Sequence, residues 1–266
     1  VFKMLDIATG VFYALKCFTR EQYGRSEAYH LISNELSFIK KDNHNYFVGI
    51  KYLEEELYVS SKVSNHNEYP VLLMDWVEGV TLDKYIKQFV FEDTLSVYAI
   101  MNLTLDFLDF ARWMSLQEIA HGDIKPDNII ITENHKLVLV DYDGMYVPKM
   151  NGKISRENGS PNYRHPNRTI NAFDSSIDNF SLSVIGFSLA AIAINKDVYN
   201  KEVDDALVFS EKDFTDLNNL NLLSRISIVL HDKICSSLFS SIMMQIANPL
   251  TKIDVNVLFS IKSYIY

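Results

Sequence analysis

Three polar residues in the segment 121–144 have types and spacing that could do chemistry, and two of them, Asn128 and Asp141, could hold a metal ion. Asn128 follows Asp123 by five positions, and Asp141 follows Asn128 by thirteen. Carboxylate and amide oxygens are ligands that Mg²⁺ accepts in proteins, usually together with water and phosphate oxygens. One Asp-to-Asn spacing is a weak signal taken singly, so the surrounding residues decide which chemistry it indicates.

The segments that carry these residues resemble the catalytic and metal-binding loops of eukaryotic-type protein kinases. They read HGDIKPDNIII over His121–Ile131 and LVLVDYDG over Leu137–Gly144. The family pattern is H-R-D-L-x-x-x-N, followed by D-F-G. The resemblance implies phosphoryl transfer from ATP with Mg²⁺, a reaction that needs metal ligands, a positioned nucleophile and cations on the phosphates.

The resemblance also assigns a role to each residue of these two loops. Asp123 would orient the substrate hydroxyl and accept its proton. Lys125 would neutralise charge on the γ-phosphate, and Asn128 and Asp141 would hold Mg²⁺.

A second group of matches lies in the first part of the chain. The residues YALK, Tyr13–Lys16, resemble the V-A-I-K strand, which places Lys16 at the α- and β-phosphates. Glu35 stands nineteen positions after Lys16 in an expected helix, with His44 nine further, and would hold the lysine by an ion pair. Glu27 is the alternative partner, but the sequence around Glu35 fits the family pattern better.

The adenine-binding residues are assigned by resemblance alone. The segment LLMDWVEG, Leu72–Gly79, resembles the kinase hinge, with Met74 at the gatekeeper position. Backbone groups of Asp75 and Val77 would meet the adenine ring, and three apolar side chains would pack on its faces. These three are Val1, Ala14 and Ile130.

Two further matches extend the resemblance over nearly the whole chain. The segment GSPNYRHP, Gly159–Pro166, is similar to the substrate-docking pattern G-T-P-x-Y-x-A-P-E. The segment IDNFSLSVI, Ile177–Ile185, is similar to D-x-W-S-L-G at the start of a buried central helix. Lys125 and Ser160 imply a protein substrate with a Ser or Thr acceptor, and the overall pattern resembles bacterial members of the superfamily.

Several positions depart from the family pattern. Gly122 stands where many kinases have an arginine that reads a phosphate on the activation segment, so we expect activity without such a phosphate. Tyr142 replaces Phe and Asp143 replaces Gly in the metal-binding loop. Asn167 replaces the Glu of the docking segment and Lys252 the Arg that usually pairs with it. Because both ends differ, we expect their side chains to lie near each other.

A glycine-rich phosphate loop is missing from the sequence. None of the nine glycines forms a pair with the spacing of such a loop. The segment VFKMLDIATGVFYALK is similar to the strand that follows that loop in kinases. We therefore expect the natural protein to continue upstream of Val1.

Two other functions remain open. A pseudokinase or interaction module could bind a nucleotide without turnover, an alternative kept open by the substituted loops. A small-molecule phosphotransferase of the aminoglycoside- or choline-kinase type would carry HGD as this chain does. The Lys125–Pro126 step and the GSPNY segment argue against the second alternative.

Composition narrows the class of protein. The 266 residues are 48% hydrophobic and 22% charged with a net charge of −9, which favours a globular chain and disfavours a nucleic-acid partner. Only two cysteines are present, without CxxC spacing, which favours a reducing, cytoplasmic location. The most apolar stretch, Phe180–Ile194, is too short for a bilayer core of about 30 Å and predicts a buried helix.

The apolar periodicity predicts an α+β architecture with two lobes. A small β-rich lobe over 1–79 includes the hinge and lacks its first strand, and a larger helical lobe over 80–266 follows, with a cleft between them. The sequence does not indicate an oligomeric state. The expected elements are strands at Val11–Phe18 and Val71–Val77, helices at Arg25–Lys41 and Leu95–Met114, and a hairpin of NIIIT and LVLVD.

Overall fold

The computed structural model describes residues 1–18, 24–39, 46–60, 67–216 and 220–253. His44, the histidine expected after Glu35, lies outside the described residues. The chain divides into two compact units, Val1–Glu78 and Gly79–Tyr266.

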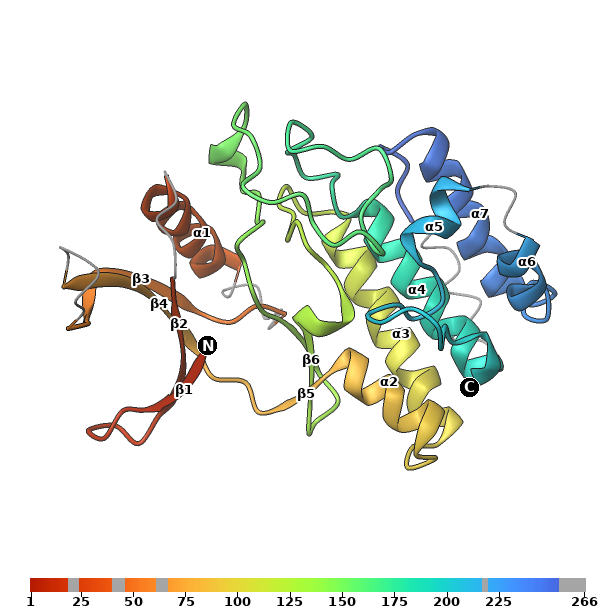
Figure 1. Cartoon of the computed structure of the whole chain (residues 1–266), viewed down its shortest axis with the longest axis horizontal. Coiled ribbons are helices and arrows are strands. Elements are labelled where there is room, and N and C mark those ends of the chain that lie inside the picture. The colour runs from red at the N-terminus through yellow and green to blue at the C-terminus, as the bar shows by residue number, and fades with distance from the viewer. Residues whose placement is uncertain (19–23, 40–45, 61–66, 217–219, 254–266) are drawn as a thin grey trace. The chain divides into compact units, whose positions relative to one another are not determined.

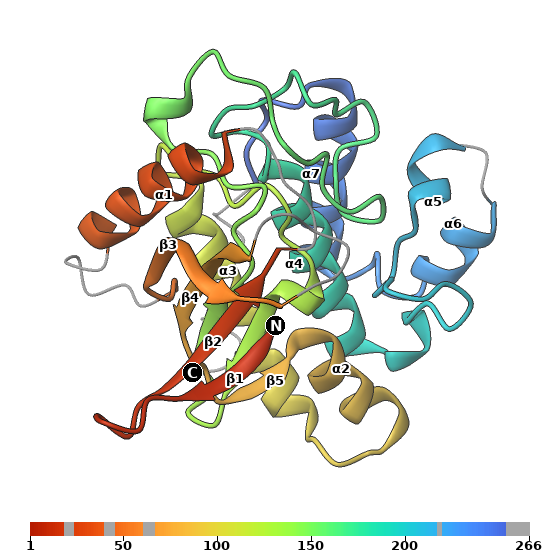
Figure 2. The ribbon, with the colours of Figure 1, turned by 60° about the vertical axis from the view of Figure 1, so that its left-hand side comes forward.

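The first unit is built on a four-stranded antiparallel sheet with the order β1-β2-β4-β3 (Figure 2). A tight turn joins the first two strands: the Asp6 carboxylate accepts hydrogen bonds from Ala8 N and Thr9 Oγ1, and Gly10 takes a positive φ of 72°. The strands are β1 (Phe2–Leu5), β2 (Phe12–Cys17), β3 (Ile50–Tyr58) and β4 (Glu68–Asp75).

One helix, α1 (Arg25–Ile39), packs against β3 in this unit. It buries Tyr29, Ile32 and Leu36 on one face, the spacing expected for an amphipathic helix. The Tyr29 ring stacks on Tyr52 of β3, with ring centroids 5.5 Å apart. These contacts fix the helix that carries Glu35 relative to the sheet that carries Lys16.

The second unit combines a small sheet with helices. Its three strands, in the order β5-β6-β7, pair antiparallel: β5 (Gly79–Thr81), β6 (Ile129–Thr132) and β7 (Leu137–Leu139). The α-helices are α2 (Leu82–Phe91), α3 (Val97–Met114), α4 (Asn179–Ile194), α5 (Glu211–Thr215), α6 (Leu220–Ile226) and α7 (Lys233–Ala247). Short 3₁₀ turns are η2 (Pro126–Asn128), η3 (Pro148–Met150) and η4 (Lys196–Val198).

Helix α4 forms the centre of the second unit. It packs against α3 and α7, and Figure 1 shows α3 and α4 side by side. Nearly all its residues from Asn179 to Ile192 are buried, which explains a sequence that is apolar on every face. Gly186 lets α3 approach closely, because a Cβ there would lie 3.0 Å from Leu108 Cδ2. Within the described ranges, no helix is long and apolar enough to cross a membrane.

The α+β fold, with a sheet-rich first part and a helical second part, is confirmed. The predicted strands, helices and hairpin are present with ends shifted by a few residues, as α1, α3, α4, β2, β4, β6 and β7 show. The helix expected over Arg25–Lys41 is described as far as Ile39. Strand β3 and helix α2 were not singled out from the sequence.

The buried position of α4 leads to a prediction about stability. Phe187 is fully buried and packs on Phe209 with ring centroids 5.1 Å apart. Phe187→Ala should lower the free energy of unfolding by about 3–5 kcal/mol, because it removes buried apolar surface and leaves a cavity. Urea denaturation measures the change.

Leu116→Ala is the control, because Leu116 is 70% exposed and its truncation should change the unfolding free energy by less than about 0.5 kcal/mol. Equal effects of the two substitutions would contradict the central role of α4.

Candidate active site

The Asp123 carboxylate is held from several sides within the second unit. Oδ1 accepts a hydrogen bond of 2.7 Å from the Ser160 backbone amide. Oδ2 accepts one of 3.2 Å from Asn128 Nδ2, and Lys125 Nζ lies 3.7 Å from the same oxygen. The side chain is 15% exposed, so its position is fixed while it still reaches the surface. A carboxylate held in this way can orient a hydroxyl group and accept its proton.

Asn128 is oriented by the same contact. Its Nδ2 also donates to the backbone carbonyl of Asp123 at 2.9 Å, which turns the amide oxygen Oδ1 away from that residue. Its backbone carbonyl accepts from Val140 N at 3.0 Å, so the loop is tied to the end of β7. Asn128 is therefore locked with its amide oxygen available as an acceptor.

Asp141 follows directly after β7 and Val140, with a positive φ of 70°. The oxygen donors of Asn128 and Asp141 fit Mg²⁺, which keeps several water or phosphate ligands and needs few from the protein. Among the described residues, no group of three or more His, Cys, Asp or Glu side chains could hold a metal by itself. These donors suit a metal that is shared with a phosphate group.

Two buried rings, those of His121 and Tyr142, form hydrogen bonds at the end of β7. His121 is fully buried; its Nδ1 accepts from Asp123 N at 3.3 Å, so we assign the ring proton to Nε2, which donates to Val140 O at 3.0 Å. The Tyr142 hydroxyl donates to Leu139 O at 2.7 Å, and its ring meets His121 edge-on. Tyr142 can therefore replace Phe in this loop, because its hydroxyl group has a buried partner.

The Asp178 carboxylate binds the backbone of the loop that carries Asp123. Its Oδ2 accepts from His121 N at 2.5 Å and its Oδ1 from Gly122 N at 2.9 Å. The carboxyl group is 2% exposed, and burial raises its pKa, an effect that His121, Arg168 and the two amides oppose. Both carboxylate oxygens are thus committed to the backbone of the loop that carries Asp123.

Gly122 sits where no side chain can be placed. Its φ is +84°, and a Cβ there would lie 2.0 Å from the backbone oxygen of Gly144. The HGD sequence is therefore a steric requirement of this fold: the loop lies directly against the residues that follow Asp141.

The docking segment is anchored to the helices by side chains inside it. Tyr163 is almost fully buried, its hydroxyl oxygen accepts from Leu207 N at 3.2 Å, and burial raises its pKa well above the usual value. His165 Nε2 donates to the backbone carbonyl of Gln245 at 3.0 Å, near the end of α7.

The expected proximity of Asn167 and Lys252 stays a prediction. Lys252 Nζ donates to the carbonyl of Ser115 at 2.5 Å, while Asn167 is exposed. In the part of the chain that the structure describes, no hydrogen bond joins the two side chains. His165 and Gln245 instead connect the docking segment to α7, with a neutral hydrogen bond in place of a buried ion pair.

The candidate nucleotide residues of the first unit lie on neighbouring strands. Ala14 and Lys16 of β2 are in register with Met74 and Leu72 of β4. Met74 is buried, and Glu35 is half-buried on α1. The ion pair between Lys16 and Glu35 stays a prediction.

The expected hinge continues from β4. Asp75 N donates to Gly49 O, and the Asp75 carboxylate accepts from Gly49 N at 2.8 Å, so this end of the strand is fixed. Val77 is half-buried, and Val1 is 74% exposed beside β1. Ile130 lies on β6 of the second unit, half-buried.

Sequence reasoning missed two residues that shape the site. Asp178 was included only as the Asp of the D-x-W-S-L-G match, without a role in the site, and Arg168 was not considered. Arg168 Nη1 donates to Gly122 O at 2.7 Å from 46 positions along the chain. The only available signal was an arginine directly after a docking-like motif, and its burial cannot be read from the sequence.

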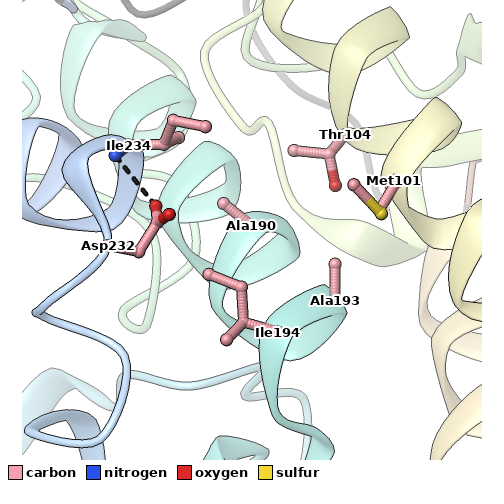
Figure 3. A pocket seen from close by; sticks show the side chains of 7 residues that line it. All are labelled: Met101, Thr104, Ala190, Ala193, Ile194, Asp232 and Ile234. Atoms are coloured by element: carbon pink, nitrogen blue, oxygen red, sulfur yellow. Dashed lines mark hydrogen bonds between the residues drawn. The ribbon is translucent and has the colours of Figure 1, made fainter. Parts of the chain in front are cut away.

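A separate cavity of about 230 Å³ lies at α3, α4 and the start of α7 (Figure 3). Its one carboxylate, Asp232, already accepts from Ile234 N and Cys235 N at the beginning of α7. The other lining side chains carry no charge, so this cavity does not suit a phosphate group. They are Met101, Thr104, Ala190, Ala193, Ile194 and Ile234.

The sequence was compared with known proteins. The family model described as the protein kinase domain matches residues 1–250. The serine/threonine-protein kinase PknA of Nostoc sp. is 33% identical over 91 residues, which cover 34% of this chain and 15% of that protein. Serine/threonine-protein kinase 32C of Mus musculus is 24% identical over 184 residues, covering 68% and 34%. The chain thus spans at most about a third of the length of these two curated relatives.

The crowding at Gly122 leads to a prediction with a matched control. Gly122→Ala and Gly152→Ala both place a side chain at positive φ, at a cost of about 1–2 kcal/mol. A Cβ at Gly152 would meet nothing within 4 Å, whereas one at Gly122 would overlap the Gly144 carbonyl. Gly122→Ala should therefore lower the unfolding free energy clearly more than Gly152→Ala, as measured by urea denaturation. Equal losses would show that the backbone contact between Gly122 and Gly144 is wrong.

Proposed function

Because the chain belongs to the protein kinase family, we propose that it transfers the γ-phosphate of ATP to Ser or Thr hydroxyl groups of protein substrates. The observation that carries the proposal is the Asp123 carboxylate, which accepts hydrogen bonds from Ser160 N and Asn128 Nδ2 and lies 3.7 Å from Lys125 Nζ. A base, a cation and an oxygen donor thus occur within one loop.

Asp123 acts as the base in this proposal. Ser160 N binds one carboxylate oxygen, so the carboxylate is oriented before a substrate arrives. The substrate hydroxyl donates its hydrogen bond to this carboxylate, which takes the proton as the oxygen attacks the γ-phosphorus. The bond from that phosphorus to the bridging oxygen breaks, and ADP leaves. Lys125 lies on the same side and offsets negative charge on the transferred group.

The phosphates of ATP meet oxygen donors and cations of this chain. Asn128 and Asp141 supply metal ligands, and Mg²⁺, when bound, neutralises phosphate charge. Lys16 binds the α- and β-phosphates, with Glu35 as its partner. The position of Lys16 on β2 supports its assignment to the phosphates. It stands two residues after Ala14, which is assigned to the adenine ring.

The adenine ring contacts the hinge residues and the apolar side chains assigned above. Met74 is buried, as a gatekeeper side chain should be, and Asp75 is fixed by hydrogen bonds to Gly49. The assigned residues are Val1, Ala14, Met74, Asp75, Val77 and Ile130.

Preference for Ser or Thr over Tyr rests on Lys125 and Ser160 and on two relatives whose names describe serine/threonine-protein kinases. The Ser160 amide approaches Asp123 to 2.7 Å, which keeps the docking segment close to the base. A short acceptor side chain suits a base held this near to the segment that binds the substrate.

Asp123→Asn tests the base directly. The variant should lower kcat by about 10²–10⁴-fold and leave KM for ATP unchanged, because the amide keeps the shape but cannot take the proton. Transfer of labelled phosphate from Mg-ATP to generic Ser/Thr acceptors measures it, beside Lys16→Met and Asp141→Asn. Asp197→Asn is the control, since that side chain is 82% exposed.

Equal labelling by wild type and all three site variants would overturn the kinase proposal. ATP binding without any transfer would identify a pseudokinase. Transfer restricted to small alcohols would identify a small-molecule phosphotransferase.

Activity should not require a phosphate on the activation segment. Ser155 is 3% exposed, and its hydroxyl donates to Glu157 O at 2.5 Å, so a phosphate would have no room there. Ser160 binds Asp123 through its backbone amide, which alanine retains. Phosphatase treatment of the wild type, and Ser155→Ala, should each leave kcat within about twofold of the starting value. A large loss that rephosphorylation restores would contradict this expectation.

A further inference from the structure

Arg168 is a buried arginine in contact with the loop that carries Asp123. The residue is 8% exposed, and its Nη1 donates to the carbonyl oxygen of Gly122 at 2.7 Å. The Gly122 amide binds Asp178 on the other side at 2.9 Å. Both backbone groups of Gly122 are therefore fixed by charged side chains.

Glycines make the space that this guanidinium occupies. A Cβ at Gly159 would lie 2.9 Å from Arg168 Nη1 and 2.9 Å from Gly122 O. Gly122 itself is closed to any side chain by Gly144. A side chain at position 122 would overlap Gly144, whereas the Arg168 guanidinium contacts the Gly122 carbonyl from the side of Gly159.

Two carboxylates partly compensate the burial of Arg168. Burial lowers the pKa of its guanidinium, an effect that Asp178 and Asp123 oppose and that Arg164 reinforces. The Nε and Nη2 of Arg168 have no hydrogen-bond partner among the described residues, so the bond to Gly122 O is the contact that sets its geometry.

The backbone of Arg168 ties the docking segment together at the same point. Its carbonyl accepts from Asn158 Nδ2 at 3.2 Å, and its amide donates to His165 O at 2.9 Å. Asn158 stands two positions before Ser160, whose amide binds Asp123. Arg168 is thus linked to the loop at Gly122 and to the segment that reaches Asp123.

We propose that Arg168 is a positioning residue that holds the Asp123 loop and the docking segment in their working arrangement, without a phosphate on the chain. This inference rests on the proposed kinase function. Many kinases carry an arginine directly before the catalytic Asp. In this chain the guanidinium comes instead from Arg168, just after the docking segment. The loop is then ordered by an internal cation and needs no added phosphate as a signal.

A filler role makes different predictions from a positioning role. Arg168→Met keeps a long side chain in the same space but removes the charge and the hydrogen bond to Gly122. If Arg168 only fills space, the Met variant keeps both kcat and the hydrogen-exchange rate of the loop. If Arg168 positions the loop, kcat falls while KM for ATP stays constant.

The test measures kcat, KM for ATP and amide hydrogen exchange over residues 119–128, in wild type, Arg168→Met, Arg168→Lys and Arg168→Ala. We expect a loss of about 10²-fold in kcat for the Met variant with unchanged KM, because small displacements of a reacting group cost about that much. Exchange in the loop should become faster, and the Lys variant should lie between Met and wild type.

Chemical rescue distinguishes the two roles, because an added guanidinium would not restore kcat if Arg168 only filled space. Methylguanidine should restore part of the kcat of Arg168→Ala and do nothing for Asp123→Asn. Arg112→Gln, at an exposed arginine of α3, is the control and should match wild type. Wild-type kcat together with wild-type exchange in Arg168→Met overturns the proposal, as does a loss of kcat that methylguanidine does not reverse.

The outcomes separate this inference from the kinase proposal. Absence of transfer by wild type refutes the kinase function, and the exchange measurement still decides whether Arg168 holds the loop. Should Arg168→Ala fail to fold, the Met and Lys variants decide by the KM-against-kcat split. Transfer by wild type that phosphatase abolishes would overturn the claim that the loop needs no phosphate.

Discussion

The site depends on the pair of hydrogen bonds from the backbone amides of His121 and Gly122 to the buried carboxylate of Asp178. Asp178 directly precedes α4, a helix buried on nearly every face, so the anchor belongs to the buried centre of the second unit. Hydrogen bonds to an ionised carboxylate are stronger than neutral ones, and burial excludes competing water. The loop that carries Asp123 is therefore held from the core and not from the surface.

The other hydrogen bonds of the loop fix its orientation relative to the end of β7. His121 and Tyr142 donate to the neighbouring carbonyls of Val140 and Leu139, which ties the loop to the end of β7 where Asp141 follows. Asn128 then bonds both the backbone and the carboxylate of Asp123. Because each partner is buried or nearly so, the arrangement of the Asp123 carboxylate and the Asn128 amide is set by the folded chain. Preorganisation of this kind reduces the rearrangement that a reaction requires.

Sequence periodicity predicted the elements well where burial alone determines them. The helix at α4 and the hairpin of β6 and β7 follow from apolar patterns over consecutive residues, and the motif spacing brought Asp123 and Asn128 together correctly. Contacts that cross long stretches of chain could not be predicted in this way. His165 meets Gln245 over 80 positions, and Arg168 meets Gly122 over 46. The proximity of Asn167 and Lys252 stays a prediction, and the long side chain of Lys252 donates to the carbonyl of Ser115.

Three glycines and one arginine pack closely together around the Gly122 carbonyl. Gly122 excludes a side chain because of Gly144, and Gly159 leaves the space that the Arg168 guanidinium fills. A larger residue at Gly159 would push against both Arg168 and the Gly122 carbonyl, so the glycine and the arginine constrain each other. Gly122, Gly159 and Arg168 thus depend on one another through these contacts. Because the Arg168 guanidinium is buried and donates to Gly122 O, this contact forms together with the fold, whereas an exposed arginine that waits for a phosphate would leave the loop free to move until the phosphate arrived.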